Sequence, residues 1–160
     1  ISFKIIHSTT ILLPAWIANL EEFGMAVKMI LHDVVTCWNS TFDMANFALE
    51  YHEYCNKLVT SPRKLGLTAC SLDEHEWELL GQLRDTLKIL KDAMLYFSRG
   101  TPNLAMVIPA MDYINNLFMD TMLSDDTVDL AICTAIQLAK KTLNWYYTLM
   151  DSSDLYRVSM

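Results

Sequence analysis

Hydrophobic residues recur at spacings of three and four through most of the chain, which is the period of an α-helix with one buried face. The most regular run predicts a helix over 80–97 that packs on other helices. Ser71 and Glu74 have the spacing of a capping box before it, Gly100 is predicted to end it, and Pro102 to begin the next helix. The run comprises Leu80, Leu83, Leu87, Leu90, Met94 and Phe97.

Two further helices are predicted nearer the start of the chain. Residues 10–23 are expected to form a short helix that ends at Gly24, because glycine adopts the left-handed backbone conformation that commonly ends a helix. Ser40 and Asp43 have the spacing of a capping box, which predicts a helix over 41–58.

Two helices are predicted after the central run. The first reaches residue 122 and should bend at Pro109, because proline lacks the backbone N–H that a helix interior requires. The second has one apolar face over 128–146, after a turn at 124–127. The predicted fold class is therefore all-α: an irregular multi-helix array of about five helices, forming one domain over 1–160.

Composition and charge narrow the classes of partner. The chain has 160 residues, a formal charge of −7 and a pI near 4.9, which argues against nonspecific binding to nucleic acid. The short basic spots are Arg63 with Lys64 and Lys140 with Lys141, and pairs this small are usually solvated surface. Because 52% of the residues are hydrophobic, some apolar surface should be left for a neighbour.

The sequence has no membrane span and no leader of the secretory type. The longest apolar stretch, 11–18, is too short to cross a bilayer and contains Pro14. Since the chain does not begin with Met, we expect it to be part of something longer. Its four cysteines form no CxxC pair, which favours a reducing compartment.

A connector over 25–39 precedes the helix predicted from residue 41. Its last part places the large aromatic Trp38 and the polar Asn39 just before a capped helix, where side chains can be presented to a ligand. A purely structural interpretation stays open, in which Trp38 packs on the first turn and Asn39 or Ser40 is the N-cap.

The same connector carries a resemblance to a known family. The run DVVTCWNSTFDM resembles the DVxTRWNSTYDML motif of hAT-family DNA transposases. Three other stretches resemble the same family in the same order: HSTTILLPAW, SRGTPNLAMVIPAMDYI and KKTLNWYYTLMDSSDLYRVSM. The resemblance covers nearly the whole chain and is closest to fungal-type copies.

The resemblance implies a place for this chain within a larger enzyme. Members of the family have an RNase H-like core interrupted by a large helical insertion, and this chain resembles the insertion and the approach to the rest of the core. The family cleaves and transfers DNA strands with two Asp and one Glu that hold divalent metal ions. The motifs around those acids are not in this chain, and Asp33 matches no catalytic position. We therefore expect no catalytic residue and no cofactor here; divalent metal is expected only for the full-length parent.

Nucleic-acid binding is implied for Trp38, Asn39 and Thr36. Trp38 matches the Trp of the family's Arg-Trp pair, whose ring stacks near the DNA end, and stacking on an aromatic face can hold an unpaired base. Cys37 stands where the family has Arg, and a thiol cannot supply a guanidinium to phosphate or base. This departure suggests a decayed or repurposed copy.

A zinc site was considered and not predicted. His52 and Cys55 lie three residues apart on one helical face, and His32 with Cys37 are close in sequence, but no second pair has ligand spacing. Cys55 is interpreted as buried packing, and the acidic residues that precede the 80–97 run as a solvated helix start.

The leading interpretation is a non-catalytic fragment of a hAT-like transposase that supports DNA-end binding and assembly in the full protein. The alternative is a transposon-derived helical module for protein interaction or oligomerisation, without DNA binding. Possible partners are DNA, through the Trp38 region, and further copies of the chain; no membrane and no small-molecule substrate are expected. Placement in the nucleus follows from the family resemblance alone.

Overall fold

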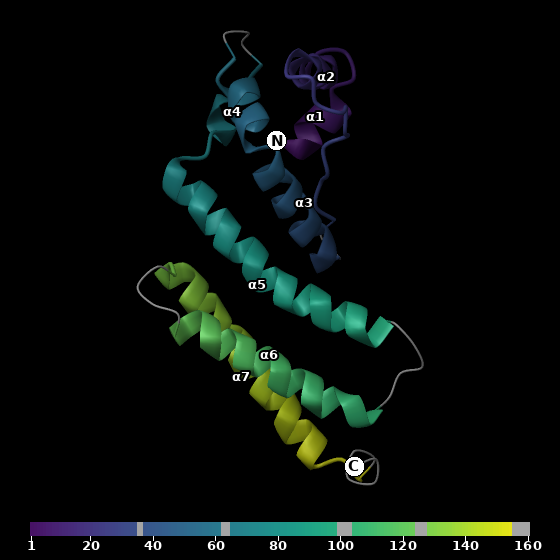
Figure 1. Ribbon diagram of the computed structural model, residues 1–160, viewed down its shortest axis with the longest axis vertical. Coiled ribbons are helices and arrows are strands. Elements are labelled where there is room, and N and C mark those ends of the chain that lie inside the picture. Colours follow the sequence, from purple (N-terminus) through teal and green to yellow (C-terminus); the bar gives the residue numbers. More distant parts are fainter. Residues whose placement is uncertain (35–36, 62–64, 99–103, 124–127, 155–160) are drawn as a thin grey trace. The chain divides into compact units, whose positions relative to one another are not determined.

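A computed structural model describes residues 1–34, 37–61, 65–98, 104–123 and 128–154. Within these residues the chain forms seven α-helices, two short 3-10 helices and no β-strand, which confirms the all-α class and corrects the expected count of five helices. No described helix is both long and apolar enough to cross a lipid bilayer. The α-helices are α1 (Ser2–His7), α2 (Leu12–Glu22), α3 (Trp38–Glu50), α4 (His52–Val59), α5 (Glu74–Ser98), α6 (Val107–Leu123) and α7 (Leu130–Asp151), and the 3-10 helices are η1 (Thr68–Cys70) and η2 (Leu104–Met106) (Figure 1).

The chain groups into two compact units, Ile1–Arg84 and Asp85–Met160. Helix α5 begins in the first unit and ends in the second, and each unit is described below by itself. The single domain expected over 1–160 stays a prediction.

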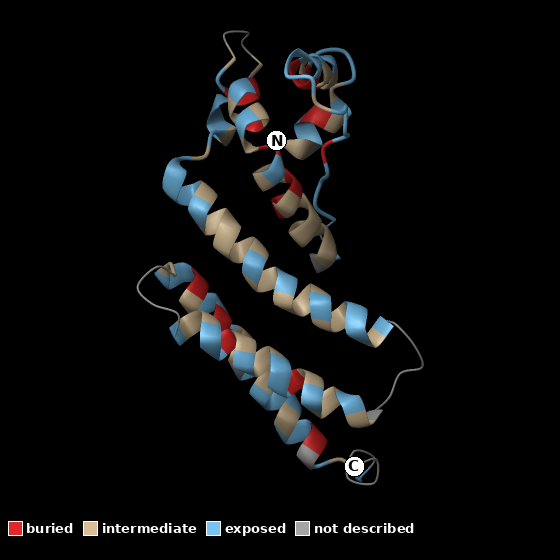
Figure 2. Ribbon diagram, viewed as in Figure 1, coloured by how far each residue is buried: buried red, intermediate tan, exposed pale blue. Residues whose placement is uncertain are grey.

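An aromatic cluster forms the centre of the first unit. Trp16 of α2 and Tyr51, which follows α3, have at most 1% of their surface exposed. Their ring centroids lie 6.1 Å apart, and Phe47 stacks on Tyr51 at 4.4 Å with an interplanar angle of 12°. These rings belong to one buried cluster with the aliphatic residues Ile5, Leu12, Leu20, Ile30, Leu58, Val59 and Leu67, and burial of this apolar surface stabilises the unit. Figure 2 shows the buried residues of α1 to α4.

The single helix predicted over 41–58 is wrong. The chain leaves α3 at Tyr51, where φ is −107° and ψ is 23°, and starts again as α4 at His52. The rings of Phe47 and Tyr51, on either side of the end of α3, lie 6.2 and 6.1 Å from the ring of Trp16 between centroids.

The start of α5 differs from the prediction by two residues. Asp73 and Glu76 form the reciprocal capping box: the backbone N–H of Glu76 donates to the Asp73 carboxylate at 2.8 Å, and that of Asp73 donates to the Glu76 carboxylate at 2.9 Å. Ser71 therefore does not cap α5. As expected, the acidic residues here, Asp73, Glu74, Glu76 and Glu78, are all exposed.

Helix α5 confirms the helix predicted over 80–97, but no residue of α5 is fully buried. All six apolar residues of the predicted seam are half-buried (Figure 2). The predicted end of α5 at Gly100 and the helix start at Pro102 lie outside the described residues.

Helices α6 and α7 lie side by side in the second unit (Figure 1). Pro109 is the third residue of α6, where a backbone N–H has no partner within the helix, so the predicted loss of a helix bond does not arise. Asp129 caps α7 by accepting a hydrogen bond from the N–H of Ala131 at 2.7 Å. Ile132 and Ile136 are the most buried residues of α7.

Candidate nucleic-acid interface

The structure places two of the three predicted DNA-binding residues at the start of α3. Trp38 and Asn39 are the first two residues of this helix, and Asn39 is half-buried. Thr36 and the side chain of Trp38 lie outside the described part of the chain.

The segment before α3 is held by the carboxylate of Asp33. The hydroxyl of Thr41 donates to Asp33 Oδ1 at 2.7 Å, and the hydroxyl of Ser40 lies 2.9 Å from the same oxygen. An isolated antiparallel bridge pairs Val34 with Cys37, and the N–H of Cys37 donates to the carbonyl of Val34 at 2.7 Å. These contacts close a tight loop that fixes where α3 begins.

Ser40 ties this loop together from inside the first turn of α3. Its Oγ accepts the N–H of Val34 at 2.7 Å and lies 2.6 Å from the carbonyl of Cys37. The N-cap of α3 is Cys37, with φ −135° and ψ 93°, and its side chain makes no capping bond. The interpretation of Asn39 or Ser40 as the N-cap is therefore wrong, because Ser40 uses its hydroxyl on the preceding loop.

The electrostatics of this site oppose a bound phosphate. Hydrogen bonds from Thr41 and then Ser40 hold the pKa of Asp33 below its ordinary value, so the carboxylate is ionised at neutral pH. The helix macrodipole stabilises a negative charge beside the first turn, and that charge repels a second anion. The neighbouring exposed side chain is Cys37 and not Arg, and a thiol supplies no positive charge to a phosphate.

The role of Asp33 is what the sequence interpretation missed. The sequence interpretation assigns Asp33 no catalytic position and predicts no structural function for it. The signal was present: an Asp seven and eight residues before a Ser-Thr pair, across a short loop that starts a helix.

Of the short basic spots, only Lys140 and Lys141 lie within the described residues. Lys140 is half-buried with its ammonium on the sulfur of Met119, while Lys141 is exposed. Arg63 and Lys64 lie outside the described residues.

The His52 and Cys55 pair is used for packing. His52 contacts Asn56 at 2.9 Å, and its ring lies against Trp77 with the ring centroids 4.4 Å apart. Cys55 is 4% exposed, and burial raises the pKa of its thiol to about 11, as expected for a packed residue. Among the described residues, no three His, Cys, Asp or Glu side chains are grouped as metal ligands.

Comparison of the chain with models of protein families, with curated proteins and with solved structures gives no match. The resemblance to hAT-family transposases therefore rests on the sequence motifs alone.

Proposed function

We propose that this chain is a non-catalytic helical part of a hAT-like DNA transposase, which supports DNA-end binding and assembly in the full protein. The observation that carries the proposal is the loop before α3. Asp33, Ser40 and Thr41, three residues of the motif that resembles the family, are joined by hydrogen bonds of 2.7–2.9 Å between side chains. A motif whose polar residues set the start of one helix has a physical reason to occur as a unit.

In this proposal the loop positions Trp38 and does not bind the DNA backbone. The ionised Asp33 and the thiol of Cys37 leave stacking on a base as the main interaction. We therefore expect the segment by itself to bind DNA weakly, with the parent protein supplying the phosphate contacts. The nucleus is proposed as its location by family resemblance alone. The chain has no proposed catalytic residue, and divalent metal belongs to the parent.

The test is binding of a fluorescent hairpin DNA and a single-stranded DNA to the purified chain by anisotropy, at two salt concentrations. Trp38→Ala should weaken binding roughly 5- to 150-fold, which corresponds to the loss of one stacked base. Trp145→Ala is the matched control, because Trp145 is an exposed tryptophan in the other unit. Equal affinities for the two variants, or no binding by the unmodified chain, would remove the DNA-binding part of the proposal.

A second candidate function is a helical interaction or oligomerisation module without DNA binding. The observation that favours it is the surface of the second unit, where eleven large hydrophobic residues are exposed and only five hydrophobic residues are buried among those described. The exposed ones are Leu95, Tyr96, Met106, Tyr113, Met119, Leu123, Leu130, Leu138, Trp145, Tyr146 and Leu149. Where such residues form a contiguous patch, they mark an interface.

The two candidates separate in one further measurement. A module for self-association should show a mass that rises with protein concentration in analytical ultracentrifugation and an anisotropy signal indifferent to DNA. Leu138→Lys, on an exposed position of α7, should reduce the association without unfolding the helix. A monomer at all concentrations that still binds DNA would favour the transposase proposal.

A further inference from the structure

Helix α7 carries a second apolar face beside the one that is buried. Ile132 and Ile136 are buried, and the residue before each of them, Ala131 and Ala135, is exposed about 100° around the helix. From Ala131 onward, exposed residues follow at alternating spacings of four and three, and five of these six residues are apolar. This outer stripe of α7 consists of Ala131, Ala135, Leu138, Thr142, Trp145 and Leu149.

The spacing of the outer stripe is that of a helix that packs on another helix. Alternation of three and four keeps the residues on one side of α7 over about 27 Å, as the a and d positions of a coiled coil do. Thr142, the one polar member, donates its hydroxyl to the carbonyl of Leu138 at 3.3 Å, so its polar group is satisfied within the helix. Leu138, Trp145 and Leu149 expose 59%, 56% and 45% of their surface, which a helical partner would remove from water.

The order of side-chain sizes along the outer stripe identifies the partner. Its first two residues, Ala131 and Ala135, are small, and its last two, Trp145 and Leu149, are large. Two copies of α7 in the same direction would set alanine against alanine at one end and tryptophan against tryptophan near the other. Because the side chains in contact set the distance between two helix axes, no single distance fits both ends of a parallel pair.

An antiparallel pair of α7 helices removes this conflict. With a two-fold axis beside residue 140, every layer joins a smaller side chain of one copy to a larger one of the other, so one interaxial distance fits all layers. The ring of Trp145 already lies against that of Tyr146, with 4.9 Å between centroids, which restricts its motion before association. The facing pairs are Ala131 with Leu149, Ala135 with Trp145, and Leu138 with Thr142.

We propose that α7 pairs with α7 of a second copy of this chain, antiparallel and in this register. The inference rests on the assembly role proposed above and adds the surface, the partner and the orientation. Because the same stripe is used by both copies, the contact closes as a dimer. The stripe spans just under three heptads, so we expect a weak dimer with a dissociation constant in the micromolar range. In more dilute solution the chain is monomeric and Trp145 stays exposed.

Lys141 is the charged residue that borders the outer stripe. In the antiparallel pair the two copies of Lys141 lie on the same side of the interface and repel each other. The net charge of −7 on each chain adds further repulsion. Self-association should therefore strengthen as the salt concentration is raised, whereas DNA binding should weaken. These opposite salt dependences separate failure of this inference from failure of the DNA-binding proposal.

Sedimentation equilibrium of the full chain without DNA measures the dissociation constant, and charges at one facing pair test the register. Ala131→Glu and Leu149→Lys suit the helix, since a negative charge is favoured near its first turn and a positive charge near its last. Each alone should weaken the dimer at least about 5-fold, because a charge then faces an apolar side chain. The double variant should form two ion pairs across the dimer and associate roughly 3- to 30-fold more tightly than the product of the single effects predicts.

Ala131→Glu combined with Thr142→Lys is the matched control. It places the same two charges at exposed positions of α7 that do not face each other across the proposed dimer, so no such recovery is expected. Circular dichroism at 222 nm should show that every variant keeps its helix content, because all three positions are exposed.

Three results would overturn the inference. A dimer that neither single variant weakens would remove this interface, and a double variant no tighter than the product of the single effects would remove the antiparallel register, because a parallel pair sets like charges together. Both leave self-association itself intact. A chain that is monomeric at every concentration would remove self-association altogether, and none of the three results bears on binding of DNA.

Discussion

Trp16→Ala is the substitution that most directly tests the core of the first unit. Trp16 has none of its surface exposed, and its ring lies against Phe47 and Tyr51 with centroid distances of 6.2 and 6.1 Å. Its indole N–H donates to the backbone carbonyl of Lys28 at 3.0 Å. The side chain thus joins α2, the end of α3 and the connector between them.

The expected decrease in the free energy of unfolding follows from this burial and these contacts. Removing a fully buried tryptophan costs about 3–5 kcal/mol, of which the cavity left behind is a substantial part. Trp16→Phe keeps an aromatic ring among its neighbours and should cost roughly 1–2 kcal/mol, through the lost hydrogen bond and reduced volume.

Urea denaturation followed by circular dichroism at 222 nm measures these losses, and hydrogen exchange shows where they fall. We expect Trp16→Ala to increase exchange mainly within residues 1–84. Trp145→Ala is the control, since this side chain is 56% exposed and should cost about 0.5 kcal/mol or less. A loss below about 1 kcal/mol for Trp16→Ala would refute the assignment of the aromatic cluster as the core.

Three further predictions concern glycines and cysteines. Gly24→Ala should destabilise the protein by about 1 kcal/mol, because Gly24 has φ 65°, which a residue with a Cβ adopts only with strain. Gly81→Ala inside α5 should instead stabilise it by about 0.5–1 kcal/mol. Neither added methyl group meets an atom within 4 Å, and thermal melts measure the sign of both changes. Burial raises the pKa of Cys55 from 9.0 to about 11, so its contribution to the free energy of unfolding is complete below pH 9 and falls by roughly 2–3 kcal/mol as pH rises to 11. Urea titrations at several pH values should show this fall in the free energy of unfolding, and Cys55→Ala should not show it. Cys37→Arg should tighten DNA binding and steepen its salt dependence by about one ion, with Cys70→Arg as control. An unchanged salt slope would contradict the placement of residue 37 beside the bound DNA.

Local sequence signals were sufficient to predict a helix whose apolar spacing and capping residues lie within the helix or directly beside it. The run from Leu80 to Phe97 predicts α5 because apolar spacing and acidic residues at its start act within a few residues of each other. Even there, Ser71 with Glu74 and Asp73 with Glu76 both have capping-box spacing, and only the structure selects the second. Helix α1 was missed because six residues carry too little periodicity.

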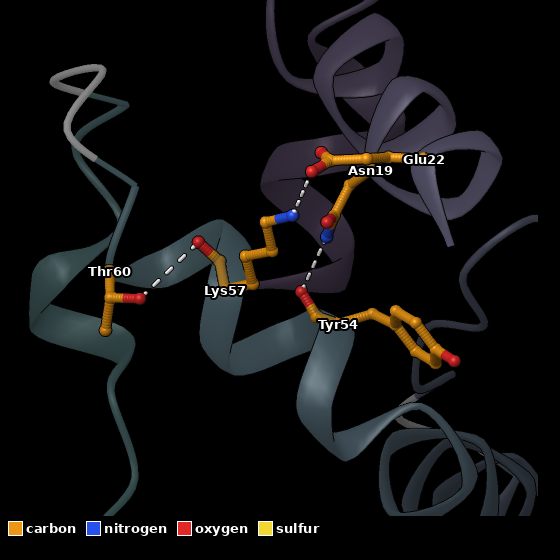
Figure 3. Close-up of polar contacts among 5 residues, drawn as sticks. All are labelled: Asn19, Glu22, Tyr54, Lys57 and Thr60. Atoms are coloured by element: carbon orange, nitrogen blue, oxygen red, sulfur yellow. Dashed lines mark hydrogen bonds and ion pairs between the residues drawn. The ribbon is translucent and has the colours of Figure 1, made fainter.

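The division between α3 and α4 could not be predicted from local spacing. Residues 41–58 have one continuous apolar face, and no local signal marks the break at Tyr51, whose ring lies near that of Trp16, thirty-five positions earlier in the chain. The same reasoning applies to Asn19, which lies seven residues after Leu12 on the buried face of α2. A lone polar residue on an apolar face is a signal that something must be bonded there, but its partner, the carbonyl of Tyr54, is known only once α2 and α4 are packed together (Figure 3).

By itself, the sequence determined that the chain is helical and where its longest helix lies, because propensity, capping and periodicity act over one or two turns. The residues expected to meet DNA stay a prediction from the family resemblance. The tertiary structure decided that Ser40 and Thr41 hold Asp33, that Tyr51 divides two helices and that Asn19 donates to the carbonyl of Tyr54. The Asp33 contacts span only seven and eight residues, whereas the hydrogen bond from Asn19 to Tyr54 joins positions thirty-five residues apart. A contact of that second kind forms only when burial of apolar surface has paid for ordering the chain between its ends.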